Sequence, residues 1–175
     1  MSKFFTRASL VGVLSLVSLQ LHVTPAIAAP QLAATPSRPQ RVKVFFPKKF
    51  AQPGNFGAVE PVWRQPQTNR VAQFAIAQLI AGPTAQERQR GLTAPMTLRG
   101  ASNCGADFTL SITSNVARLQ FCRQIVSGGV GDDARMVSAL TATLKQFPPV
   151  LSVVLLDQKG NCLGDMSGEN RCLRR

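Results

Sequence analysis

A pair of carboxylate side chains held at a fixed spacing can hydrolyse a glycosidic bond. Asp107, Asp132 and Asp133 are the acids that such a pair would require. The surrounding pattern places Asp107 at a strand and the other two at the start of a helix, and nothing in the sequence brings them together. We therefore expect the protein not to be an enzyme and to have no catalytic residues.

Histidine supports the same expectation, because it is the usual general base and the commonest metal ligand. His22 is the only histidine, and it lies in an N-terminal segment that we expect to be removed. Without it, Ser-His and Cys-His catalysis and most zinc chemistry are excluded. We expect neither a metal nor a cofactor.

The four cysteines are better suited to disulfides than to metal binding. An even number of cysteines in an oxidising compartment predicts disulfide bonds, although four cysteines allow three pairings. Local strand and loop closure favours Cys104 with Cys122 and Cys162 with Cys172. The tight CxxC pairs of a four-cysteine zinc site are absent from the sequence.

Two other patterns could bind small ions. Gly128–Gly131 precedes a helix and could hold a phosphate, but it lacks the P-loop lysine, and the two aspartates that follow would repel an anion. A connecting loop is the preferred interpretation. A set of oxygen-bearing side chains near the C-terminus lacks the DxDxDG order of a calcium loop, and we interpret its members as polar residues on the surface: Asp157, Asn161, Asp165, Glu169 and Asn170.

Basic residues outnumber acidic ones. The chain has 20 Lys and Arg against 8 Asp and Glu, and loss of Lys3 and Arg7 with the N-terminal segment leaves 18 against 8, a net charge of +10. Such a field attracts polyanions, which outside the cytoplasm means wall polymers, anionic headgroups or an acidic protein, and not nucleic acid. A solvated surface without a ligand is the alternative. The candidate contacts are Arg41, Lys43, Lys48, Lys49, Arg88 and Arg90, with further arginines at positions 99, 171, 174 and 175.

Aromatic residues near this basic segment offer a second interpretation. Trp63 beside Arg64, together with Phe50 and Phe56, could form a stacking platform. Because these aromatics are scattered along the chain, packing in the core is the preferred interpretation.

The N-terminal 28 residues have the form of a secretory signal peptide. A charged start is followed by the apolar run Leu10–Leu21 and the small residues Ala26–Ala28, where cleavage is expected. The apolar run is shorter than the ~20 residues that a membrane span needs. Residues 29–40 are rich in Pro and Ala and predict a flexible leader. We expect residues 41–175 to form one exported domain, periplasmic or secreted, without a transmembrane segment.

The domain is organised around residues 69–91. Apolar residues at i, i+3 and i+4 spacing from Val71 to Ile80 predict a helix that covers a sheet. Gly82 and the following proline end it. Thr84 and Glu87 have the spacing of a capping box, which predicts a second short helix that ends at Gly91.

Alternating and apolar segments supply the other elements. Strands are expected at 41–46, 59–64, 106–113, 116–124 and 150–156, the last as a central strand buried on both faces. Pro61 in the second strand implies an edge or a bulge. Ser114-Asn115 predicts a two-residue hairpin turn, and Asp132 or Asp133 is expected to cap a helix that Pro148 and Pro149 end. The order β-β-α-β-β-α-β predicts a two-layer α+β fold, a mixed sheet with two main helices on one face.

Several of these blocks resemble a GerMN domain, the sporulation and spore germination domain of bacterial envelope proteins. They are VKVFFP, AQFAIAQLIAGPTAQERQRGL, FTLSITSNVARLQF and MVSALTATLKQFPPVLSVVLL followed by DQKG, and together they cover roughly residues 41–160. The cysteines and the tail after Gly160 are additions to the family pattern.

The resemblance implies an extracytoplasmic, non-enzymatic domain, similar to modules that build rings in envelope assemblies. We therefore expect a binding or scaffold domain that joins envelope proteins, with the strand at 59–64 as the sheet edge for a partner. Binding of peptidoglycan or another wall polyanion is the alternative.

Overall fold

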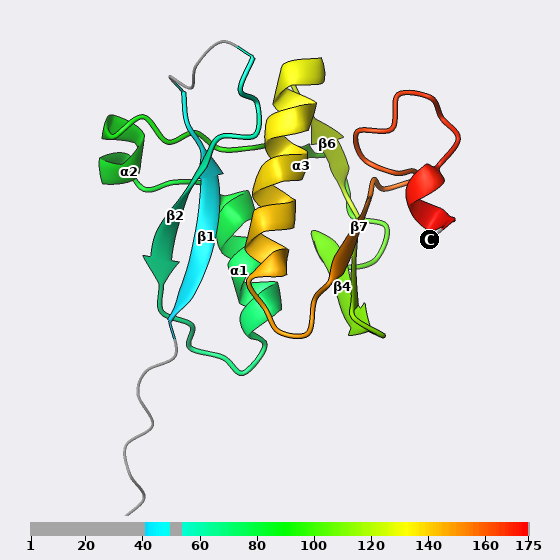
Figure 1. Ribbon diagram of the computed structural model, residues 1–175, viewed down its shortest axis with the longest axis horizontal. Coiled ribbons are helices and arrows are strands. Elements are labelled where there is room, and N and C mark those ends of the chain that lie inside the picture. The colour runs from blue at the N-terminus through cyan, green and yellow to red at the C-terminus, as the bar shows by residue number, and fades with distance from the viewer. Residues whose placement is uncertain (1–40, 50–53, 175) are drawn as a thin grey trace, which may run out of the picture. The chain divides into compact units, whose positions relative to one another are not determined.

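The computed structural model describes residues 41–49 and 54–174, which belong to a unit spanning residues 37–175. The predicted signal peptide (1–28), the predicted leader (29–40) and Phe50 lie outside the described residues. Figure 1 shows the arrangement of the helices and strands.

The predicted helix, break and second helix are present. α1 spans Val71–Ala81 and α2 spans Ala85–Gln89. Gly82 ends α1 with a φ of 84°, in the region that favours glycine. In the capping box, the Glu87 amide donates to Thr84 Oγ1 at 3.3 Å and the Thr84 amide donates to Glu87 Oε2 at 2.8 Å. The glycine at the end of α1 and the capping box of α2 each depend on residues a few positions apart, so both form as predicted.

α2 is also attached to the strand β2 (Val59–Arg64) by an ion pair. Two guanidinium nitrogens of Arg64 donate to the two carboxylate oxygens of Glu87, each at 2.7 Å, and both side chains are largely buried. The hydrogen bond from Arg64 and those from Thr84 lower the pKa of Glu87 from 4.5 to about 2, although burial opposes the shift. This bidentate pair holds the short helix in place.

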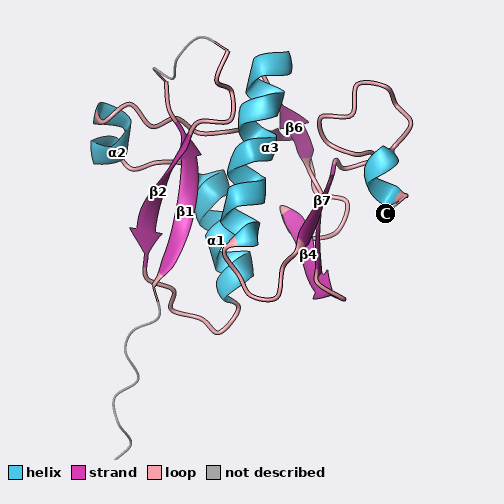
Figure 2. Ribbon diagram, in the orientation of Figure 1, coloured by secondary structure: helices cyan, strands magenta, loops and turns pink. Residues whose placement is uncertain are grey.

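The strands form three small sheets in the described part of the chain, whereas the sequence predicted one (Figure 2). The α+β class and a mixed sheet are confirmed, since β5 is antiparallel to β4 and parallel to β7. The sheets are β1 (Val42–Pro47) with β2, β3 (Thr97–Arg99) with β6 (Gln124–Val126), and β4 (Phe108–Thr113) with β5 (Val116–Phe121) and β7 (Ser152–Leu156).

The single strand predicted at 116–124 is wrong. β5 ends at Phe121, and β6 begins only at Gln124. At this break the Cys122 amide donates to the Asp107 carbonyl at 2.8 Å, and the chain turns to pair β6 with β3. Because β3 is distant in sequence, alternation of side chains within 116–124 could not reveal the change of partner.

The position predicted for the last strand is also wrong. β5 is central in its sheet, and β7 lies beside it at the outside. Leu151, which the prediction placed in the strand, is 74% exposed. The apolar character of this segment therefore does not come from a central position in the sheet. Leu156, at its end, is fully buried next to the C-terminal tail, where it forms a bridge with Cys162.

The helix α3 begins earlier than predicted, at Val130, and ends at Lys145. Gly129 is its N-terminal cap and no side chain caps it, so the prediction that Asp132 or Asp133 is the cap is wrong. Both aspartates instead lie in the first turn, where a negative charge is favourable to the helix dipole.

The core lies where α1 and α3 meet the strands. α3 contacts both β1 and β7, and α1 contacts β1 and α3; in Figure 1 the two helices run between the β1–β2 ribbon and the β4–β5–β7 sheet. The largest fully buried apolar side chains come from all of these elements: Val44, Phe46, Ile76, Leu79, Leu92, Leu119, Phe121, Met136, Leu140, Leu144 and Leu156.

Candidate functional site

The outer edge of β1 is closed by side chains of α3. The Lys43 amide donates to Gln146 Oε1 at 2.9 Å, and Gln146 Nε2 donates back to the Lys43 carbonyl at 2.7 Å. The Phe45 amide donates to Oγ1 of the fully buried Thr143 at 3.1 Å. Both backbone groups of Lys43 and the amide of Phe45, which would otherwise receive another strand, are therefore already bonded.

The outer edge of β2 is interrupted by Pro61. Because Lys43 and Phe45 direct their backbone groups toward α3, the antiparallel register directs those of Val59, Pro61 and Trp63 away from β1. Proline has no amide hydrogen, so the middle donor of this edge is missing. The Trp63 carbonyl also accepts a hydrogen bond from Arg64. The predicted edge position of this strand is confirmed, but the edge is poorly suited to strand addition.

The far side of β7 is covered by the C-terminal tail. The Leu163 amide donates to the Leu155 carbonyl at 2.9 Å, and the Asp157 amide donates to the Asn161 carbonyl at 2.9 Å. A disulfide joins Cys162 and Cys172, whose Cα atoms are 6.0 Å apart. This tail, residues 157–174, therefore shields the strand and is closed on itself by a covalent bond.

The edge of β4 has no such cover. Thr113 and Val116 flank the two-residue turn, whose residues have φ values of 50° and 65°, as a type I′ hairpin requires. In this hairpin the odd-numbered residues of β4 bond to β5, and the backbone groups of Phe108, Leu110 and Ile112 point outward. Within residues 41–49 and 54–174 these outward groups have no hydrogen-bond partner. We call them the β4 edge.

The side chains of β4 also suit strand pairing. The strand has no proline, glycine or charge, which are the features that proteins use to block an edge. Phe108 and Leu110 are half-buried against the core, and Ile112 is 37% exposed. Thr109 and Ser111 place hydroxyl groups on the solvent side. Sequence reasoning favoured the strand at 59–64 as the partner edge, whereas the structure favours β4.

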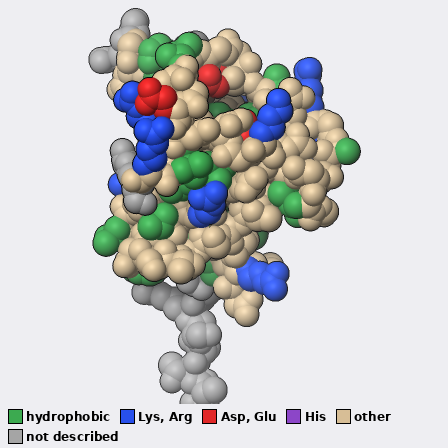
Figure 3. Space-filling model, turned by 90° about the vertical axis from the view of Figure 1, so that its right-hand side faces the viewer, with side chains coloured by type: hydrophobic (Ala, Val, Ile, Leu, Met, Phe, Trp, Pro, Cys, Tyr) green, Lys and Arg blue, Asp and Glu red, His purple; other side chains and the backbone are tan. Residues whose placement is uncertain are grey.

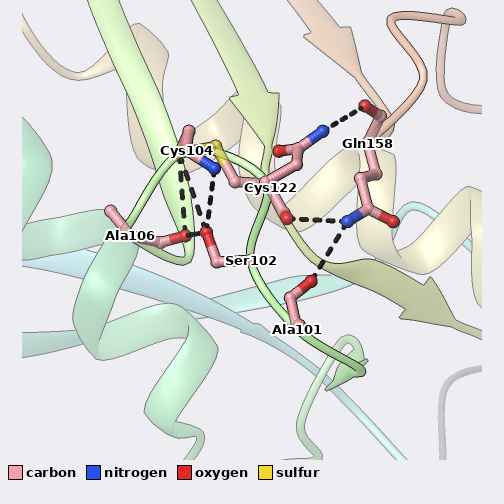
Figure 4. Close-up of a disulfide and its surroundings, with 7 residues drawn as sticks. Ala101, Ser102, Cys104, Ala106, Cys122 and Gln158 are labelled. Carbon is pink, nitrogen blue, oxygen red and sulfur yellow. Dashed lines mark hydrogen bonds between the residues drawn. A yellow bond between two sulfur atoms is a disulfide. The ribbon is translucent and has the colours of Figure 1, made fainter.

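The start of β4 is fixed by the other disulfide (Figure 4). Cys104 and Cys122 are joined, with Cα atoms 5.7 Å apart; both disulfides have the pairing that the sequence favoured. Gln158, which follows β7, donates through Nε2 to the Cys122 carbonyl at 2.9 Å and to the Ala101 carbonyl at 3.2 Å. The loop before β4 is thus attached to the residues that follow β5 and β7, which makes the β4 edge a preformed surface.

Two of the six candidate polyanion contacts lie together on the outer face of the β1–β2 ribbon. Trp63 is 51% exposed, so its predicted packing in the core is wrong. The Arg41 guanidinium lies 5.1 Å and the Lys43 ammonium 5.2 Å from the centre of its ring. Lys43 is directly across the ribbon from Trp63. We call these three residues the cationic Trp site.

Of the other four candidates, Lys48, Lys49 and Arg90 lie at the opposite end of β1, and Arg88 belongs to α2. The Lys49 amide donates to the Gly91 carbonyl at 2.8 Å, which places the end of β1 beside the exit of α2 and therefore beside Arg90. Lys48 forms an ion pair with Glu60 at 2.9 Å, and Arg88 donates to the Pro83 carbonyl. Elsewhere, on the face drawn in Figure 3, Lys and Arg side chains are spread out and do not form one patch.

Phe56 is the other aromatic residue of the predicted platform within the described residues. Its ring packs against α3, apart from the cationic Trp site. It is 41% exposed, and Arg135 stands 5.1 Å from its ring centre. The ring approaches Gly131 so closely that a Cβ there would lie 2.9 Å from it. Its role is to pack against the first turns of the helix.

The glycine loop and the acidic residues have structural partners. The Gly128 amide donates to Asp132 Oδ2 at 3.1 Å, so the aspartate occupies the position that a bound anion would need. Asp132 also pairs with Arg135, and Asp107 pairs with Arg123. In the tail, Asp157 and Asp165 accept hydrogen bonds from backbone amides and close turns. The described residues contain no group of acids, cysteines or histidines arranged to hold a metal ion.

Aspartates line parts of two depressions in the surface. One, of about 600 Å³, lies between α3 and the tail and is lined in part by Asp133, Asp157 and Asp165. The other, of about 520 Å³, lies beside the end of β1 and includes Asp132 and Arg135. Three of these aspartates, Asp132, Asp157 and Asp165, accept hydrogen bonds from backbone amides of the fold. No helix in the described part of the chain has the length and apolar character needed to cross a bilayer.

Comparison with known proteins gives a consistent result. The family model described as "Germane: Sporulation and spore germination" matches residues 43–159, so both cysteines of the tail disulfide lie beyond the match. A solved structure of the first GerMN domain of the sporulation protein GerM from Bacillus subtilis is 20% identical, with a TM-score of 0.48, and the match covers 67% of this chain and 82% of that one.

A structure of the tandem GerMN domains of the same Bacillus subtilis protein is 18% identical, with a TM-score of 0.47. That match covers 68% of this chain and 39% of the tandem structure. A search of curated proteins gave no match.

Proposed function

The chain belongs to the GerMN family, the family of sporulation and spore germination, and from this membership we propose that it is an exported, non-enzymatic module that joins proteins of the cell envelope. The observation that carries the proposal is the β4 edge, a rigid row of backbone donors and acceptors that the described residues leave unbonded. Exposed strand edges bind partner chains through main-chain hydrogen bonds.

Export is supported by the cysteine chemistry. Two disulfides persist in oxidising compartments outside the cytosol and are rare inside it. A non-enzymatic role is supported by the acids that were considered for hydrolysis, since Asp107 and Asp132 are each held by an arginine.

Crosslinking in intact cells followed by purification of the tagged chain tests the proposal. We expect one or more envelope proteins to be recovered with the natural sequence and to be lost with Ile112→Lys, because a lysine at this half-exposed position places a charge against an arriving strand. Met166→Lys is the matched control, since Met166 is 78% exposed on the tail. Recovery of wall polymer alone, with no protein, would argue against the assembly role.

A second function is favoured by the cationic Trp site. An exposed aromatic ring flanked by two cations can contact both the sugar rings and the anionic groups of a wall polymer. The net charge of the exported chain would attract such a polymer over a long range. We propose this as the alternative to protein–protein assembly.

Tryptophan fluorescence tests the alternative directly, because the chain has one Trp and no Tyr. Titration with solubilised peptidoglycan fragments should change the emission of Trp63, and the change should weaken steeply as salt rises. Lys43→Gln should weaken binding, whereas Lys48→Gln, a matched charge removal in the ion pair with Glu60, should have little effect. An unchanged emission at low salt, together with no sedimentation of the protein with purified sacculi, would exclude this function.

A further inference from the structure

We propose that the β4 edge pairs with the β4 edge of a second copy of this chain, antiparallel and about a two-fold axis at Leu110. This inference rests on the proposed assembly function and names the partner of that surface. It joins the two three-stranded sheets into one continuous sheet, with the helices of both copies on the same side.

The backbone supports this register. The outward residues Phe108, Leu110 and Ile112 are placed symmetrically about Leu110, so the two-fold axis sets Leu110 opposite Leu110 and Phe108 opposite Ile112 of the second copy. Each outward residue offers one amide and one carbonyl, and antiparallel neighbours of this kind exchange both bonds. The pairing therefore satisfies every outward group of both strands, with about six hydrogen bonds.

The side chains match in the same register. On the core side, Phe108 meets Ile112 of the second copy, which covers an apolar side chain that is 37% exposed in one copy. On the solvent side, the hydroxyl of Thr109 stands opposite that of Ser111. Apolar cross-strand pairs and pairs of hydroxyl side chains both stabilise a sheet. An unrelated peptide would have to reproduce this alternation, whereas a second copy supplies it.

Charge does not oppose the pairing at close range, although the chain is strongly basic. β4 itself is uncharged, and the acid that precedes it, Asp107, is paired with Arg123. The nearest exposed cation in the sheet, Arg118, lies one strand behind, opposite Ser111. The two copies of Arg118 would be separated by at least three strand spacings, about 14 Å. This exceeds the Debye length of about 8 Å at physiological salt.

Sedimentation equilibrium of the exported chain is the first test. We expect a mass that rises to twice that of one chain as concentration increases, and a single-chain mass at every concentration for Ile112→Lys. Met166→Lys, on the exposed tail, should behave like the natural sequence. Circular dichroism of each variant shows whether it is folded. A folded natural sequence that keeps the single-chain mass throughout would overturn the proposal.

Cysteine crosslinking tests the register separately and without a charge. Thr109 and Ser111 are both exposed, so Thr109→Cys and Ser111→Cys should fold. In the proposed pairing, position 109 lies directly opposite position 111 at about 4.5 Å between Cα atoms, within the range for a disulfide. An oxidised mixture of the two variants should give a covalent dimer, and each variant alone should give little. A mixture of Thr109→Cys with Thr113→Cys is the control for random contact.

The two proposals fail in different ways. If the chain sediments as a single copy and the mixture does not crosslink, the second copy is not the partner, and that result overturns this inference. Loss of an envelope protein from the Ile112→Lys purification would then still support the assembly function through another chain. A covalent dimer in the mixture supports the inference even when no other envelope protein is recovered.

Discussion

Glu87 keeps its negative charge in a largely buried position because Arg64 and Thr84 bond to it. Its pKa is about 2 in the folded protein, against 4.5 for an unperturbed glutamate. The folded state therefore prefers the charged form, and this contribution to stability is complete above pH 4.5 and is lost as the pH falls toward 2. A shift of this size corresponds to roughly 3 kcal/mol.

We expect the free energy of unfolding of Glu87→Gln to depend less on pH than that of the natural sequence between pH 5 and about 2.5. Urea unfolding followed by circular dichroism at several pH values measures the difference. Glu60→Gln is the control, since Glu60 pairs with the exposed Lys48 and such pairs contribute little. Equal pH dependence in Glu87→Gln and the natural sequence would contradict the role assigned to the ion pair.

Thr143 provides a second prediction at a single side chain. Its hydroxyl accepts the Phe45 amide in a fully buried position. Thr143→Val keeps the shape and removes the acceptor, so the free energy of unfolding should fall by about 1–3 kcal/mol, the cost of a buried donor without a partner. Thr143→Ser keeps the hydroxyl and should retain the hydrogen bond. Chemical denaturation of both variants, and exchange of the Phe45 amide by NMR, measure the effect.

At the scale of elements, the two edges of the β1–β2 ribbon are protected in different ways, and the protection of β2 depends on one residue. Pro61→Val restores the missing donor on the outward edge of β2 and adds a residue that favours strands. We expect a new self-association, seen as increased light scattering that Ile112→Lys does not abolish. Pro66→Val, beyond the end of β2, removes a proline without changing the edge and should leave scattering unchanged.

Elements that depend on neighbours in sequence could be predicted. The break at Gly82, the capping box at Thr84 and the turn at Ser114-Asn115 all follow from residues within a few positions of one another. The partition into three sheets could not be predicted, because β6 chooses β3 instead of extending β5. The outer position of β7 in its sheet was also mispredicted, because the tail that covers the far side of this strand has no regular pattern.

At the scale of the whole molecule, the tail is held to the domain by the disulfide between Cys162 and Cys172. The double substitution Cys162→Ser with Cys172→Ser removes this disulfide, whose cysteines are ten residues apart in the sequence. The free energy of unfolding should fall by roughly 2–3 kcal/mol as a result. The tail of this variant should also be cut faster by trypsin near Arg171. Limited proteolysis followed by mass spectrometry measures the rate. Equal rates in the variant and the natural sequence would show that hydrogen bonds alone hold the tail.

The candidate site was only partly accessible from the sequence. Composition indicated the basic character of the ribbon, and local closure favoured the observed pairing of the cysteines among the three that four cysteines allow. The β4 edge could not, because its availability depends on what covers the other strands. Gln146 and Thr143 close β1 from a helix about 100 residues away, a relation that no local pattern expresses.

The coverage of the strands has a consequence for the size of any assembly. In the described part of the chain, β1, β2 and β7 are each obstructed on their outer side, so two copies joined through β4 present no further open edge of the β1–β2 ribbon or of the β4–β5–β7 sheet. Growth by strand pairing through these two sheets stops at a closed pair instead of continuing into a filament. The C-terminal extension beyond the family match would thus act as a terminator of polymerisation, and a chain without it could elongate from both sides.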